Sequence, residues 1–164
     1  MGLLLFIFHV EELGLQKVGL KREKLMDNDR FLDNGNGTIT DNQIKVIWRK
    51  TDSFQDTKKW LNWFKGQDYV EITNIERLAG CEDWRYPTEE EAWSLFDLSY
   101  KNTDKYGDDI YLHSIFEPGS AGTTWTLKEQ DSSALVVQYE DGMKVWPSKY
   151  AHLNMAYRMV SPIA

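Results

Sequence analysis

The chain has 164 residues, a length that suits one domain with a single hydrophobic core. Its formal net charge is −7. A field of that sign repels phosphate backbones, so a nucleic-acid partner would need a local basic patch. The best candidate patch consists of Lys17, Lys21, Arg22 and Lys24. Glu23 interrupts this patch, and we interpret it as a solvated face. We therefore expect no nucleic-acid partner.

The first ten residues, MGLLLFIFHV, are apolar, but bilayer crossing needs roughly 18–20 such residues. A cleaved signal peptide would place a basic residue before the run, whereas here Glu11 and Glu12 follow it. We expect no transmembrane segment, and we expect the run to be buried on the domain's own core or against a partner. Residues 1–26 are interpreted as an extension and residues 27–164 as the domain.

Turn and strand patterns follow the extension. The sequence DNGNGT at residues 33–38 predicts a tight turn between residues 30–32 and 38–40, because glycine and asparagine tolerate positive φ. Ile44, Val46 and Trp48 then alternate with polar neighbours, which predicts a half-buried strand.

Two helices are predicted from capping patterns. Ser53 with Asp56 marks a helix start, an apolar stripe runs from Phe54 to Phe64, and Gly66 is placed to end that helix. Thr88 with Glu91 forms a second capping box, whose helix carries on one face Ala92, Leu95, Phe96 and Ser99.

The last 40 residues predict sheet. Residues 123–127 favour a strand, residues 134–139 and 143–146 flank the hairpin dipeptide Asp-Gly, and residues 156–160 suit a closing strand. Strands, two helices, a loop-rich middle and further strands predict an α+β fold, with two helices packed on small twisted antiparallel sheets.

Three segments together resemble one family. They are the turn at residues 33–42, the sequence DWRYPT at residues 83–88, and Trp125-Thr126 followed by residues 157–160. The combination is similar to the Lcl C-terminal domain family over about residues 27–162. That resemblance implies a C-type-lectin-like fold. Members occur mostly in bacterial exported or surface proteins, and known roles involve adhesion to sulfated polysaccharides. Residues 44–46 depart from the family pattern.

Several matched residues suit an architectural role. Asp83 and Arg85 flank Trp84, so a charged pair is expected to close over a buried indole, and Arg158 is expected to reach an acidic partner. We interpret as structural the set Trp48, Asp83, Trp84, Arg85, Pro87 and Arg158.

No metal, cofactor or catalytic set is expected. Glu117-Pro118-Gly119 with Trp125-Thr126 keeps only half of a lectin-type Ca²⁺ motif, because glycine supplies no side-chain oxygen. Gly35 likewise occupies a ligand position of the Asp/Asn-rich stretch, so a turn is favoured there. Cys81 is the sole cysteine, which rules out an internal disulfide.

The leading functional hypothesis is a non-catalytic binding module for a polysaccharide or a protein surface. Its candidate contacts are aromatic rings and nearby cations: Tyr106, Tyr111, Trp125, Lys144, Trp146 and Lys149. The alternative is a subunit of a larger assembly that docks through residues 1–26. An enzyme, the least favoured class, would need a pocket with perturbed carboxylates around Asp108, Asp109 or Glu117.

Overall fold

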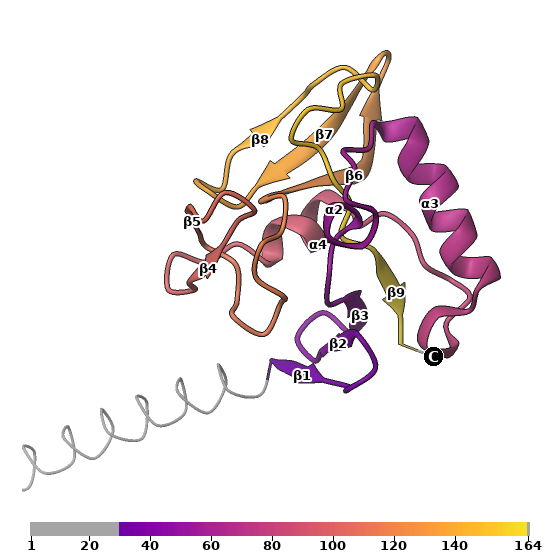
Figure 1. Ribbon diagram of the computed structural model, residues 1–164, viewed down its shortest axis with the longest axis vertical. Helices are drawn as coiled ribbons and strands as arrows, with labels where there is room; N and C mark the ends of the chain where they lie inside the picture. The colour runs from indigo at the N-terminus through magenta and orange to yellow at the C-terminus, as the bar shows by residue number, and fades with distance from the viewer. Residues whose placement is uncertain (1–29, 164) are drawn as a thin grey trace, which may run out of the picture.

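The computed structural model describes residues 30–163, which form a mixed α+β domain with three separate antiparallel sheets (Figure 1). The first sheet has the strand order β1-β2-β3-β9. Its strands are β1 (Phe31–Asp33), β2 (Thr38–Asp41), β3 (Val46–Arg49) and β9 (Val160–Pro162). The last strand therefore pairs with one from the start of the domain, which closes the fold.

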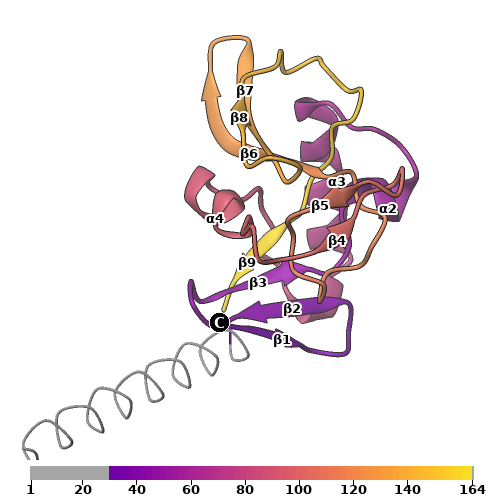
Figure 2. The same cartoon turned by 90° about the vertical axis from the view of Figure 1, so that its left-hand side faces the viewer.

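The other two sheets lie away from the first (Figures 1 and 2). One is a meander of β6 (Thr123–Gln130), β7 (Ser133–Gln138) and β8 (Lys144–Val145), and β6 is one of its edges. The other pairs β4 (Asn102–Thr103) with β5 (Asp109–Ile110). The predicted hairpin around Asp141-Gly142 is confirmed as the β7–β8 connection.

The turn between β1 and β2 forms as predicted. Gly35 and Gly37 have φ of 72° and 82°, values that glycine adopts without strain. The Asp33 carboxylate accepts a 2.9 Å hydrogen bond from Gly35 N and pairs with Lys50 at 2.7 Å. The oxygens of this stretch thus serve the turn and its neighbours.

The predicted first helix is wrong in its extent, because two helices replace it. They are α2 (Ser53–Thr57) and α3 (Trp63–Ile75). Asp52, rather than Ser53, is the N-cap of α2, and Lys58, with φ of 57°, ends that helix in the left-handed region. Asn62 then caps α3. The apolar stripe therefore spans a break.

Gly66 lies inside α3 and does not end it. A Cβ built on Gly66 would be 2.0 Å from the ring of Tyr157. That ring is fully buried, and its hydroxyl donates a 2.9 Å hydrogen bond to the carbonyl of Asn62. Glycine is required at position 66 because the Tyr157 ring lies against the backbone of α3 and is fixed there by its burial and by its hydrogen bond to Asn62.

The second predicted helix is confirmed as α4 (Glu89–Ser94), with its capping box intact. The Glu91 carboxylate accepts from Thr88 N at 2.8 Å, and the Thr88 hydroxyl accepts from Glu91 N at 3.2 Å. The helix ends at Ser94, so it is shorter than the predicted apolar face. The predicted closing strand is also displaced, from residues 156–160 to β9.

The core has two clusters. One joins the first sheet to α4 and includes Trp48, Leu95 and Phe116. The other lies under α3 and contains Trp63, Tyr86, Ala134, Val136, Trp125 and Tyr157. Within residues 30–163, no helix has the length and apolar content that a bilayer span requires. The apolar run Met1–Val10 lies outside the described residues.

Replacing Gly66 with alanine tests the close contact. Alanine favours helix by up to about 1 kcal/mol over glycine, but overpacking against Tyr157 costs roughly 1–3 kcal/mol or more. We expect G66A to lower the free energy of unfolding in urea denaturation. The exposed substitution E71A on the same helix is the control and should change stability little. A G66A protein more stable than the wild type would contradict this packing.

Candidate functional site

An open groove of about 800 Å³ lies between α3, residues 77–86 and β6. Its lining comes from all three segments: Trp63, Gln67, Val70, Glu71, Asn74, Ile75, Arg77, Glu82, Arg85, Tyr86, Leu127 and Glu129. Figure 1 shows α3 along one side of the molecule beside β6. A concave site of this volume is typical of ligand-binding pockets.

Buried aromatic rings fix the floor of the groove. The Trp63 indole nitrogen donates to the carbonyl of Thr126 at 3.2 Å, which ties α3 to β6. The Tyr86 hydroxyl donates to the carbonyl of Trp63 at 2.8 Å, and the two rings pack edge to face. Both rings are buried. Hydrogen bonds within the chain therefore hold two walls and the floor in register.

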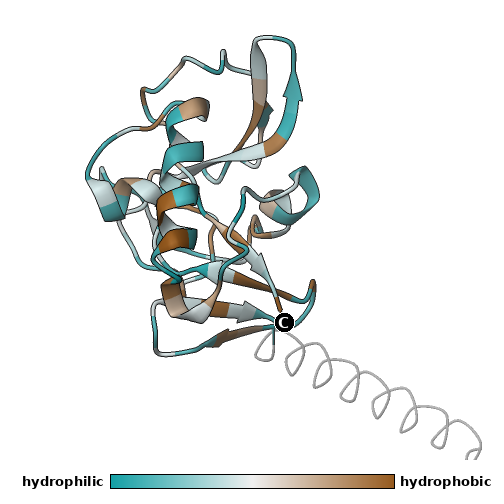
Figure 3. Ribbon diagram, turned by 90° about the vertical axis from the view of Figure 1, so that its right-hand side faces the viewer, coloured by the Kyte–Doolittle hydropathy of each residue, from teal (hydrophilic) through white to brown (hydrophobic). Residues whose placement is uncertain are grey.

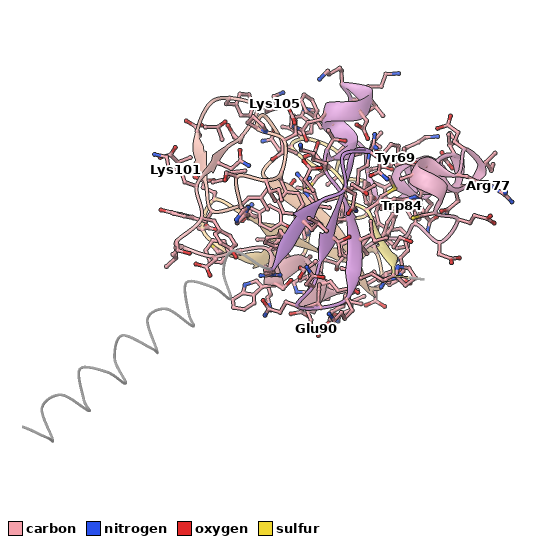
Figure 4. All side chains as sticks on the ribbon, turned by 90° about the horizontal axis from the view of Figure 1, so that it is seen from below. Tyr69, Arg77, Trp84, Glu90, Lys101 and Lys105 are labelled. Carbon is pink, nitrogen blue, oxygen red and sulfur yellow. The ribbon has the colours of Figure 1, made fainter. Side chains whose placement is uncertain are left out.

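The third wall is fastened by Asn74. Its side-chain amide donates to the Trp84 carbonyl at 2.9 Å, and its oxygen accepts from Trp84 N at 2.7 Å. The Trp84 indole, 2% exposed, donates to the carbonyl of Leu78 at 3.2 Å. Figure 4 shows Trp84 inward of Arg77, which projects at the edge of the molecule. The groove is therefore preformed.

The walls expose aliphatic side chains. Ile75 on α3 is 73% exposed and Leu127 on β6 is 47% exposed, while Val70 is half-buried. Figure 3 shows hydrophobic segments on α3 from this side of the molecule. Exposed apolar side chains that gather around one depression indicate an interaction site.

The rim carries charges of both signs. Arg77 pairs with Glu82 at 3.0 Å, and Arg85 pairs with Glu91 of α4 at 2.8 Å. Glu71 also lines the rim and is exposed. Charges around an interface contribute to specificity and association rate more than to affinity.

The predicted pair of Asp83 and Arg85 does not form. The guanidinium of Arg85 binds both oxygens of Glu91 at 2.8 Å, and Asp83 is exposed. Glu91 is available because the capping box already holds it at the start of α4. The indole of Trp84 is buried although no Asp83–Arg85 pair covers it. Trp48 and Pro87 are buried as well.

Arg158 is buried, but its hydrogen bonds differ from those expected. Its guanidinium donates to the carbonyls of Arg49 and Lys50, at 3.2 and 2.7 Å, and lies over the ring of Phe116. Burial lowers the pKa of Arg158, and the nearby charge of Asp52 opposes that effect. Burial raises the pKa of Asp52, and Arg158 opposes it in turn.

Trp125 is wrongly predicted as a stacking residue. Its side chain is fully buried, packs against Tyr157, and donates to the carbonyl of Leu61 at 3.1 Å. Lys149 is also largely covered, since its ammonium group donates to the carbonyl of Asp131 at 2.8 Å and pairs with Glu129. Neither side chain is free to stack on or pair with a ligand.

Two other candidates belong to one aromatic row. Tyr111 packs edge to face on Phe96, Phe96 contacts Trp93, and the Lys144 ammonium group lies 5.1 Å from the Trp93 ring centre. Lys144 also pairs with Glu89 at 2.8 Å. Trp93 is 45% exposed and was missed by the sequence prediction. The sequence did contain a signal for this exposure, because Trp93 does not lie on the predicted apolar face of α4.

The remaining candidates are exposed. Tyr106 is 64% exposed, and with the rings of Phe54 and Trp60 it surrounds the Lys105 ammonium group at 4.3–4.6 Å. Trp146 is 42% exposed, just after β8. Neither residue lines the groove.

The three carboxylates named for an enzyme do not share one cavity. Asp108 and Asp109 line a smaller cavity of about 200 Å³ with Tyr106, whereas Glu117 is not part of it. Across residues 30–163, no group of three or more His, Cys, Asp or Glu side chains is arranged to hold a metal ion.

The fold and groove define a mixed α+β domain with a preformed surface depression. The family model for the Lcl C-terminal domain matches residues 37–161, most of the chain. The protein therefore belongs to the Lcl C-terminal domain family. No curated protein and no solved structure matches it.

The wall formed by residues 77–86 gives a pH-dependent prediction. Burial alone would raise the pKa of Glu91, but hydrogen bonds from Arg85 and Thr88 N outweigh it and hold the pKa below its ordinary value of 4.5. A lowered pKa in the folded state contributes stability above pH 4.5 that is lost as the pH falls through the folded-state pKa.

We expect E91Q to cost about 1.5–3 kcal/mol at neutral pH, because it removes a charge-assisted hydrogen bond. The difference from the wild type should shrink steadily below pH 4.5 in urea denaturation. The exposed neighbour supplies the control E90Q. A cost that stays constant down to pH 3 would contradict an ionised Glu91 in the folded protein.

Proposed function

We propose that this domain is a binding module that holds an extended polypeptide segment in the groove between α3 and β6. The observation that carries the proposal is the pair of exposed aliphatic side chains, Ile75 and Leu127, on facing walls of a preformed groove. Full burial of one such side chain contributes about 1.5–3 kcal/mol, so both together supply useful affinity.

The lining favours a peptide over a sugar in this groove. Sugar recognition by stacking needs exposed ring faces, whereas Trp63 and Tyr86 are only 8% and 4% exposed. Apolar peptide side chains instead fit against Val70, Ile75 and Leu127. The neutral side chain of Gln67 lies among them, where a backbone amide of a ligand can find a hydrogen-bond partner.

A second candidate function is polysaccharide binding at the aromatic row on α4. Trp93 presents an exposed indole beside Lys144 and Glu89, a combination that suits stacking on a sugar ring with polar contacts at its edge. This surface is separate from the groove, because none of the three residues lines it.

The groove is tested with full-length protein and a library of displayed peptides of random sequence. We expect selection of peptides with two or more apolar residues, and we expect the double variant I75D/L127D to weaken their binding at least tenfold. Placing two carboxylates at the contact removes apolar burial of more than 1.4 kcal/mol, which is tenfold in affinity. Both positions are exposed, so folding should be retained.

Leu98, 71% exposed and outside the groove, supplies the matched control L98D. Equal binding by I75D/L127D and L98D would refute the groove as the peptide site. The polysaccharide alternative is tested separately on a glycan array, where W93A should abolish binding and I75D/L127D should leave it intact.

A further inference from the structure

We propose that Glu71 on α3 selects the charge of the ligand, so that the segment held in the groove carries a lysine or arginine two positions from an apolar residue. The inference rests on the proposed function of the groove. It narrows the ligand from any extended polypeptide to one class, a basic peptide with alternating apolar residues.

Glu71 is the one charged side chain of the lining that has no partner within residues 30–163. No hydrogen bond or ion pair in that part of the chain reaches its carboxylate, and the residue is exposed. The other charged residues of the lining all form ion pairs. These are Arg77 with Glu82 at 3.0 Å, Arg85 with Glu91 at 2.8 Å, and Glu129 with Lys149.

An unpaired carboxylate favours a cation at its point of the groove. A basic side chain of the ligand can bind Glu71 directly, whereas the other carboxylates of the lining would first have to release the cations that they hold. An acidic ligand would instead meet the uncompensated charge of Glu71. The formal net charge of the chain, −7, acts in the same direction, because it attracts basic peptides from solution. Charge complementarity therefore assigns a lysine or arginine to the ligand.

The position of this basic residue follows from the geometry of α3. Glu71 and Ile75 both line the groove and are four residues apart on the helix, so they are neighbours on one face. Four residues advance about 6 Å along a helix axis. In an extended peptide, side chains two positions apart point to the same side and are separated by about 6.6 Å. A basic side chain opposite Glu71 therefore places the residue two positions away opposite Ile75, where an apolar side chain is favoured.

The two contacts contribute differently to binding. An ion pair that stays in contact with water contributes up to about 1 kcal/mol, which is about fivefold in affinity. Salt weakens this contribution, because the carboxylate of Glu71 is exposed and therefore screened. Apolar contacts with Ile75 and Leu127 supply the larger share and depend little on salt. Glu71 therefore determines which peptides bind more than how tightly they bind.

The first experiment selects peptides from one random displayed library with the full-length wild type and with full-length E71K. We expect wild-type selection to enrich lysine or arginine two positions from an apolar residue. Selection with E71K should enrich aspartate or glutamate at that position and keep the apolar residues. Glu76 is exposed on the same helix and does not line the groove, so E76K is the matched control and should give the wild-type preference.

The second experiment measures one wild-type-selected peptide and its analogue with glutamine in place of the basic residue, by fluorescence anisotropy. We expect the analogue to bind the wild type and E76Q about fivefold more weakly than the parent peptide does. E71Q should bind the two peptides equally, because the partner of the basic residue is gone. In about 0.5 M salt the fivefold difference on the wild type should become smaller.

Three results would overturn the inference. These are wild-type selection without a preference for basic residues, the same basic preference in selection with E71K, and an equal loss for the analogue on E71Q and on the wild type. In each case the proposed function stands if I75D/L127D still weakens binding at least tenfold. Selected peptides that bind I75D/L127D normally, or a library from which no peptide is enriched, would instead refute the peptide groove and the inference together.

Discussion

The buried charges of Arg158 and Asp52 are the constraint on which the rest of the structure depends. Arg158 donates to the backbone carbonyls at the end of β3. Asp52 caps α2 and accepts a 2.7 Å hydrogen bond from Ala121 N, just before β6. Their opposite charges interact where both side chains are buried. Removing either charge would leave the other buried with less electrostatic compensation, which destabilises the fold. Three distant segments are thereby fixed at one point.

The groove follows from this junction. Tyr157, next to Arg158 in sequence, packs on Gly66 and sets how close α3 lies to the core. Trp63, one turn earlier on α3, then reaches the carbonyl of Thr126 in β6. One short stretch of chain therefore determines the separation of the two walls. Ile75 and Leu127 remain exposed on those walls because no further element covers them among the described residues.

Local patterns predicted local structure well. The glycine-rich turn, the β7–β8 hairpin and the capping box of Thr88 and Glu91 depend on neighbouring residues, so the sequence contains the needed information. Family membership was likewise predictable from DWRYPT with the turn. The errors arose where residues distant in sequence determine the structure. Gly66 is required by the close approach of the Tyr157 ring, Arg85 pairs with Glu91, and Trp125 is buried in the core. The groove was not predicted because the helix was expected to end at Gly66, so Val70 and Ile75 were not recognised as residues of one helix face.

Amide hydrogen exchange on the full chain, with and without a library-selected peptide, tests the central claim most directly. The account predicts added protection in the second half of α3 and in β6 around Leu127, since these backbones form the walls of the occupied groove. Protection confined to α4 and β8, with α3 and β6 unchanged, would contradict it and would assign binding to the surface around Trp93.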